Sequence, residues 1–189
     1  MDADRAAYLR VMARVASALD AVGVDYVVTG SMAAGFFGTP RFSADIDIVI
    51  NATTQDRSYV AKVLTDDFFA DADVIRQAFG ERSMFNIVDK EEHVNVDIIF
   101  WNKTFSPGDI FARHREVDVE GTIVKLISPE DLIIAKLLWA KDSHSEMQMR
   151  DIHGLLHYHG LDHDDVRRTA GRLGVVGLLE EARSERYAT

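Results

Sequence analysis

Two aspartates, Asp45 and Asp47, flank a single isoleucine in a short apolar segment. Side chains two positions apart on a β-strand point to the same face of the sheet, so these carboxylates project together. Two carboxylates on one face are suited to a divalent cation. A Gly30-Ser31 pair that ends an earlier apolar run is the kind of small-residue turn that accommodates a phosphate. The combination indicates metal-dependent phosphate chemistry.

A third carboxylate, Asp97, interrupts the apolar segment from Val94 to Phe100. A buried carboxylate is costly unless it is paired or binds a cation, so its position calls for a reason. If this segment lies beside residues 45–50, the three aspartates converge on one or two Mg²⁺ ions. The alternative for each aspartate is a solvated residue at a strand edge.

Four further side chains are candidates because of their positions in the predicted elements. Arg41 lies in the loop before Asp45 and is either a phosphate ligand or a plain surface arginine. Lys136 lies in an apolar helical run, where lysine is seldom buried without a partner. Arg150 and Asp151 form either an ion pair that orients Lys136, a lining of the acceptor pocket, or a structural salt bridge between helices.

Hydrophobic periodicity predicts the elements that must position these residues. Helical spacing covers residues 4–22, and short apolar or alternating runs predict strands at 25–29 and 45–50. A Glu120-Gly121 turn joins the two arms of a predicted hairpin. The other predicted elements are helical turns at 32–37, helices at 54–66 and 72–79, strands at 84–88 and 94–100, and hairpin arms at 116–119 and 122–127.

From Ser128 onward the pattern is helical. Ser128 is a good N-cap, with a proline at the first helical position and acids in the first turn. Further helices are predicted at 145–158, 162–173 and 175–185, and Trp139 is assigned to the core. The predicted organisation is a mixed-sheet α/β core over residues 1–127, with helices flanking the sheet, and a C-terminal helical segment over residues 128–189 packed on it.

Composition limits the classes of partner. The 189 residues contain no cysteine and carry a formal net charge of −10. We expect a cytoplasmic protein without a membrane partner, because no apolar run approaches the roughly 20 residues that span a bilayer. The negative charge disfavours nucleic acid, apart from an RNA acceptor held by a local basic patch. A nucleotide is not disfavoured, because a metal bridges its phosphates.

The order Gly30-Ser31, Asp45-x-Asp47 and a later Asp97 resembles the nucleotidyltransferase fold of the polymerase-beta type. Further motifs are similar to those of small bacterial nucleotidyltransferases related to the abortive-infection toxin AbiEii, and the resemblance covers nearly the whole chain. These motifs are Phe85-Asn86-Ile87, Pro129-Glu130-Asp131-Leu132 with Lys136-Leu137, and Arg150-Asp151-Ile152.

The resemblance implies a role for each matching residue. Gly30 and Ser31 would hold the triphosphate of an NTP donor, and Lys136 would face it. The alternative for Lys136 is a side chain whose stem packs on apolar surface while its ammonium reaches solvent. Asp45 and Asp47 would hold two Mg²⁺ ions, which Mn²⁺ can replace. Asp97 would bind the ion that activates the acceptor hydroxyl and would accept its proton.

The sequence therefore predicts a Mg²⁺-dependent nucleotidyltransferase that moves a nucleoside monophosphate onto a hydroxyl of a small molecule, a protein or an RNA. The resemblance adds a toxin role with an antitoxin partner to this expectation. The alternative is a module with the same fold that binds nucleotides or proteins without turnover.

Overall fold

The computed structural model describes residues 2–39, 45–102, 109–143 and 145–187. The chain divides into two compact units. The first comprises Met1–Thr29, Ser43–Trp101 and His114–Leu126, and the second comprises Gly30–Phe42, Asn102–Arg113 and Ile127–Thr189. The last passage from the first unit to the second falls between Leu126 and Ile127, where the sequence pattern changes from alternating to helical.

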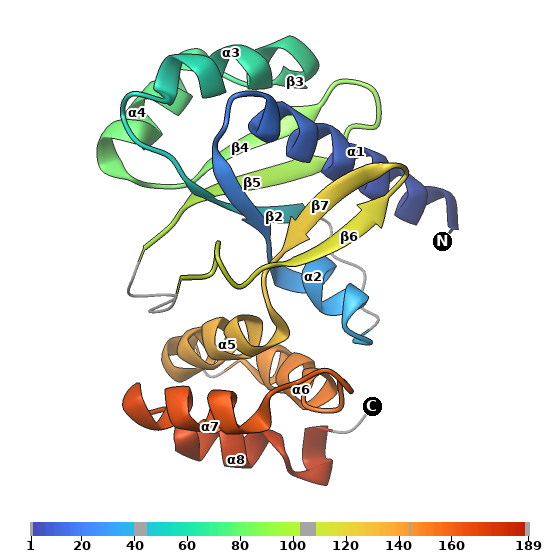
Figure 1. Ribbon diagram of the computed structural model, residues 1–189, viewed down its shortest axis with the longest axis vertical. Coiled ribbons are helices and arrows are strands. Elements are labelled where there is room, and N and C mark those ends of the chain that lie inside the picture. The colour runs from blue at the N-terminus through green and yellow to red at the C-terminus, as the bar shows by residue number, and fades with distance from the viewer. Residues whose placement is uncertain (1, 40–44, 103–108, 144, 188–189) are drawn as a thin grey trace. The chain divides into compact units, whose positions relative to one another are not determined.

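A mixed seven-stranded sheet forms the centre of the first unit (Figure 1). Its strand order is β3-β4-β5-β2-β1-β7-β6. The β2–β5 and β1–β7 pairs are parallel, and the other pairs are antiparallel. The strands are β1 (Asp25–Val28), β2 (Asp45–Asn51), β3 (Phe68–Phe69), β4 (Phe85–Asp89), β5 (Asn95–Phe100), β6 (Arg115–Val119) and β7 (Thr122–Leu126).

Three helices pack in the first unit, namely α1 (Asp2–Ala21), α3 (Arg57–Asp67) and α4 (Ala72–Glu81). Helix α1 contacts β1, β7 and α3, and α4 contacts β4 and α3. Alternate residues of the central strands are fully buried, as shown by Ile46, Ile48 and Ile98. The residues between them in β2 are only half-buried. This alternation gives the sheet one apolar face and one face that carries the aspartates.

The second unit is helical. It contains α2 (Gly30–Phe36), α5 (Pro129–Ser143), α6 (Glu146–Leu155), α7 (His163–Arg172), α8 (Val176–Ala182) and a 3₁₀ turn, η1 (Glu185–Tyr187). Helix α5 contacts α2, α6, α7 and α8, which explains why nearly every residue of its first two turns is buried. Ser128 caps α5 as predicted, because its Oγ accepts a hydrogen bond from the Asp131 N–H at 3.1 Å.

The mixed α/β architecture is the predicted one, but two local expectations are wrong. Trp139 is 60% exposed and is not a core residue. Apolar side chains occur on several sides of α5, so hydrophobicity alone does not identify the side that its neighbours leave open. The helix predicted from residue 54 begins at Arg57, because Thr53 and Asp56 form a hydrogen-bonded turn before it.

Candidate functional site

The three predicted metal ligands lie in two neighbouring strands of one sheet. Strands β2 and β5 run parallel, and Asp47 stands directly opposite Asp97 in their register. Neighbouring strands are about 4.8 Å apart, so the two carboxylates are adjacent. Asp45 precedes Asp47 by two residues in β2 and therefore shares its face. The condition that the sequence left open, that the two acidic segments lie side by side, is met.

All three aspartates lie on the less buried face of the sheet. Asp45, Asp47 and Asp97 are half-buried, whereas the isoleucines between them are fully buried. Asp97 is therefore not the buried carboxylate that the apolar pattern of its strand predicts. The apolar side chains around it belong to the opposite face, and solvation offsets part of the cost of its charge.

Neighbouring strands donate hydrogen bonds to Asp97 and to the backbone of Asp47. The amide Nδ2 of Asn86 in β4 donates to Asp97 Oδ1 at 3.0 Å. The backbone N–H of Thr29, which follows β1, donates to the carbonyl of Asp47 at 2.8 Å. Thr29 is the residue before Gly30, so the hydrogen bond anchors the chain beside β2 just before the predicted phosphate turn begins.

Tyr8 of helix α1 lies in the electrostatic field of the acids. Burial raises the pKa of the Tyr8 phenol, and the negative charges of Asp45 and Asp4 raise it further. The phenol therefore stays protonated at neutral pH and can donate a hydrogen bond. No motif in the sequence marks Tyr8 as a candidate.

The donor set suits Mg²⁺ in its chemistry. Magnesium prefers hard oxygen ligands and typically binds through one or two carboxylates together with waters and substrate phosphates. The adjacent pair Asp47 and Asp97 meets that need. Within the described residues, however, no group of three or more His, Asp or Glu side chains is gathered into a metal site.

Gly30 and Ser31 begin helix α2. Gly30 has a φ of 64°, in the left-handed region that favours glycine, so the chain turns sharply at this point. Ser31 is buried. Arg41, the third predicted phosphate ligand, lies outside the described residues.

Lys136 is held inside the second unit by acceptors on helix α6. Its Nζ donates to Asp151 Oδ2 at 2.7 Å and to Gln148 Oε1 at 3.0 Å. The side chains of Lys136 and Asp151 are only 6% and 4% exposed. Of the alternatives drawn from sequence, the geometry contains an ion pair between helices in which Asp151 orients Lys136. The acidic partner of Lys136 is Asp151 of helix α6, so the sequence of α5 alone does not reveal it.

Arg150 does not join this pair. Its guanidinium lies 3.9 Å from Glu146 and is 58% exposed. An ion pair between Arg150 and Asp151, one of the alternatives that the sequence left open, does not form among the described residues, and Asp151 pairs with Lys136 instead. Consecutive residues of a helix point about 100° apart, so one of them faces α5 while the other faces away.

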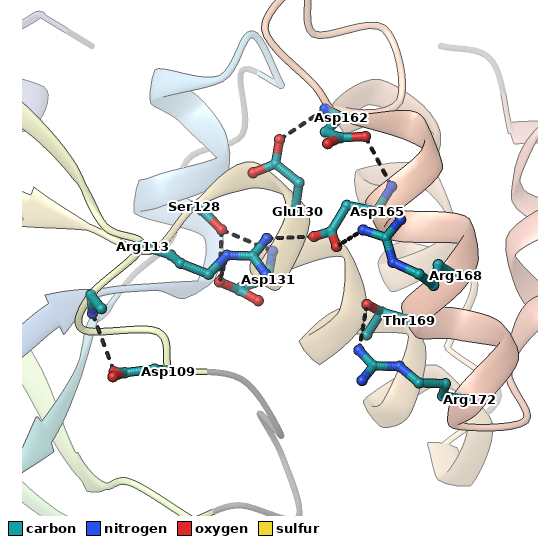
Figure 2. A network of polar contacts seen from close by, with 11 residues as sticks. Asp109, Arg113, Ser128, Glu130, Asp131, Asp162, Asp165, Arg168, Thr169 and Arg172 are labelled. Atoms are coloured by element: carbon teal, nitrogen blue, oxygen red, sulfur yellow. Dashed lines mark hydrogen bonds and ion pairs between the residues drawn. The ribbon is translucent and has the colours of Figure 1, made fainter.

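The acidic motif Glu130-Asp131 takes part in a network of polar contacts in the second unit (Figure 2). Arg113 contacts Asp131 at 3.4 Å and donates to Asp165 of α7 at 2.5 Å. Glu130 Oε1 accepts a hydrogen bond from the Asp162 N–H at 2.9 Å. These contacts tie residue 113 and the start of α5 to the start of α7.

The two carboxylates that face Arg113 have pKa values shifted in opposite directions, although Arg113 lowers both. Burial raises the pKa of Asp131, although the Ser128 hydroxyl and the Arg113 charge oppose that shift. Burial would also raise the pKa of Asp165, but hydrogen bonds from Arg113 and Arg168 outweigh it and lower the pKa. Together with the hydrogen bond of Glu130, these contacts give both carboxylates of the Glu130-Asp131 motif structural partners within the helical unit.

A shallow hollow of about 630 Å³ lies at the β3 edge of the sheet. None of the predicted site residues lines it. Lys90, which does, donates to the carbonyls of Thr65 and Asp66 and lies over the ring of Phe69. These contacts are typical of a lysine that caps the end of a helix, so the hollow gives no sign of chemistry.

No helix in the described part of the chain is long and apolar enough to cross a membrane.

Several solved structures of nucleotidyltransferases or nucleotidyltransferase-like proteins have a similar fold. An antigenic nucleotidyltransferase-like protein from Paracoccidioides brasiliensis matches with a TM-score of 0.56 at 18% identity, over 92% of this chain and 90% of that one. The antibiotic-resistance factor ANT(2'')-Ia matches with a TM-score of 0.52 at 14% identity, over 96% of this chain and 93% of that one. A second structure of that factor contains adenylyl-2''-tobramycin. At these identities the likeness establishes the fold alone.

No curated protein sequence is significantly similar to this chain. The family model described as "Nucleotidyl transferase of unknown function (DUF2204)" matches residues 8–172. That span covers most of the chain and includes the three aspartates, Asn86, Lys136 and Asp151. The chain therefore belongs to this nucleotidyltransferase family.

Proposed function

We propose that the chain is a Mg²⁺-dependent nucleotidyltransferase that moves a nucleoside monophosphate from an NTP to an acceptor hydroxyl. The observation that carries the proposal is the pairing of β2 with β5, which sets Asp47 opposite Asp97 on the half-buried face with Asp45 beside them. Membership of a nucleotidyltransferase family supports the reaction class.

The proposed chemistry divides between bound Mg²⁺ and the side chains. Bound Mg²⁺ would neutralise charge on the attacking and leaving oxygens of an in-line displacement. Asp45, Asp47 and Asp97 would hold the ions. Asp97 would accept the proton of the acceptor hydroxyl as its oxygen bonds to the α-phosphorus, and the α–β phosphoanhydride bond would break to release pyrophosphate. Gly30, Ser31, Arg41 and Lys136 remain the candidates for contacting the donor phosphates.

For the acceptor we propose the hydroxyl of a small cationic molecule of the aminoglycoside type. The formal net charge of −10 favours a cationic acceptor over RNA. The same fold in ANT(2'')-Ia is seen with adenylyl-2''-tobramycin. The alternative is a toxin with an antitoxin partner, which would transfer the nucleoside monophosphate to RNA or to a protein instead of a small molecule.

The test is transfer of label from α-³²P-labelled NTPs with Mg²⁺, scored together with pyrophosphate release. Tobramycin, total RNA and the protein itself serve as separate acceptors. We expect transfer by the wild type and its loss in Asp47→Asn and Asp45→Asn, because these changes remove ligand charge while keeping the side-chain volume. The matched control is Asp25→Asn, an exposed carboxylate of the same sheet, which should retain full activity.

Each alternative gives its own result. Wild-type turnover in Asp47→Asn would refute the metal-site proposal. Tight NTP binding in calorimetry, without transfer or pyrophosphate for any acceptor, would favour the binding module. Label on RNA or on protein, rather than on tobramycin, would replace the small-molecule acceptor with a macromolecular one.

A further inference from the structure

Asn86 belongs to the same row of side chains as the acids. Strands β4, β5 and β2 are neighbours in the sheet, and Asn86 pairs with Asp97, which pairs in turn with Asp47. Partners in register share a face, so the three side chains form one line across three strands. Asn86 is exposed, whereas Asp47 and Asp97 are half-buried.

The hydrogen bond between Asn86 and Asp97 has a defined direction. A carboxylate only accepts, so the Asn86 group that faces it is the amide nitrogen, and Nδ2 lies 3.0 Å from Asp97 Oδ1. The contact of the same nitrogen with the Val96 carbonyl is longer, at 3.5 Å. The carboxylate of Asp97 is therefore the main acceptor.

Strand order determines which side of Asp97 is restrained. Asn86 approaches from β4, on one side of β5, while Asp47 lies in β2 on the other side. The amide can therefore fix the carboxylate of Asp97 without entering the space between Asp97 and Asp47. Two aspartates in adjacent strands repel each other, so a neutral donor on the outer side keeps Asp97 in place at no cost in added charge.

We infer that Asn86 is a positioning residue for the metal site: its amide holds Asp97 in the orientation that binds the divalent ion. This inference rests on the proposed function, because it assigns Asn86 to the same ion. Groups that orient metal-binding carboxylates through hydrogen bonds typically change metal affinity by 10- to 100-fold when removed.

The test measures Mn²⁺ affinity from the EPR signal of the free ion, with the metal alone and no nucleotide. Asn86→Ala removes the donor and the volume, and Asn86→Leu removes the donor while keeping most of the volume. We expect both to weaken Mn²⁺ binding roughly tenfold or more. Asn51→Ala, an exposed asparagine at the end of β2, is the matched control and should bind as the wild type does.

Thermal unfolding separates positioning from stability. A purely structural role would lower the unfolding midpoint of both Asn86 variants and leave the Mn²⁺ affinity of the folded protein unchanged. That result, or Mn²⁺ affinity within twofold of wild type in both variants while Asp97→Asn loses binding, overturns the role of Asn86 and leaves the metal site intact. If wild type and Asp97→Asn bind Mn²⁺ equally weakly, the metal site itself is wrong and the inference falls with it.

Discussion

Lys136 and Asp151 form an ion pair between α5 and α6, with 2.7 Å between Nζ and Oδ2 and both side chains almost fully buried. Removing one partner of a buried pair leaves an uncompensated charge, while replacing both with apolar residues of similar size is often tolerated. The helical unit should therefore lose more stability when one of the two residues is replaced than when both are replaced together.

We predict that Lys136→Met lowers the free energy of unfolding by about 3 kcal/mol or more, because the substitution removes the ammonium that contacts the buried Asp151 carboxylate. The double variant Lys136→Met/Asp151→Leu should recover most of that loss, to within about 1 kcal/mol of wild type. Urea denaturation measures both values. Lys141→Met, at an exposed lysine of the same helix, should change stability by less than about 0.5 kcal/mol. Equal destabilisation of the single and double variants would contradict this account of the pair.

The double variant also tests whether Lys136 contacts the donor. Because it should fold, its NTP affinity reports on the missing ammonium and not on unfolding. We expect weaker NTP binding by calorimetry, as a phosphate ligand would require. Affinity equal to wild type would leave Lys136 with the structural role alone.

The pKa of Asp165 predicts a pH-dependent contribution to stability. Although burial opposes it, hydrogen bonding to Arg113 and Arg168 lowers this pKa in the folded state. Its stabilising contribution is therefore fully present above the unfolded-state pKa, about 3.9, and is lost as the pH falls through the folded-state value. We expect the difference in unfolding free energy between wild type and Asp165→Asn to be constant near neutral pH and to shrink below about pH 4.

A variant comparison is needed because Asp131 acts in the opposite direction. Its raised pKa means that the folded state takes up a proton before the unfolded state does, so its contribution to stability rises as the pH falls. Asp164→Asn, at an exposed carboxylate in the same turn of α7, controls for the charge near the helix N-terminus. A pH-independent difference for Asp165→Asn would contradict the assignment.

Gly154 allows Thr39 to approach helix α6 closely. A Cβ added at Gly154 would lie 2.5 Å from Thr39 Oγ1 and 3.1 Å from its Cγ2. We predict that Gly154→Ala lowers the free energy of unfolding by about 1–3 kcal/mol through overpacking. Combining it with Thr39→Ala should restore most of the loss, and a double-mutant cycle in urea measures the coupling.

Gly171→Ala is the matched control for Gly154. Gly171 is also helical and has open space around its Cα, so alanine there should stabilise the protein by up to about 1 kcal/mol. If Gly154→Ala were equally stabilising, the contact with Thr39 would not limit this position.

Residue patterns predicted most of the fold. The alternation in β2 and β5, the 3.6-residue spacing in α1 and the cap at Ser128 are local signals. They failed for the two-residue strand β3, which is too short to show a period, and for Trp139, whose exposure depends on which sides of α5 its neighbours cover.

Sequence identified the acids of the candidate site but not their arrangement. The pairing of Asp47 with Asp97 joins strands that are separated by α3, β3, α4 and β4, and no local spacing encodes it. The same holds for the pair between Lys136 and Asp151, and for Asn86, whose role depends on the residue that faces it across the ladder. Tertiary packing determines which side chains of different elements become partners.

The parallel pairing of β2 with β5 also sets the order in which the candidate site assembles. Asp97 can reach Asp47 only after the segment between β2 and β5 has been synthesised and its two ends have come together. Such non-local pairing slows folding in proteins that are dominated by it. A nascent chain that ends before β5 would therefore present Asp45 and Asp47 without their third carboxylate. The three carboxylates of the candidate site would then come together only when β5 pairs with β2, before β6 and β7 join the sheet.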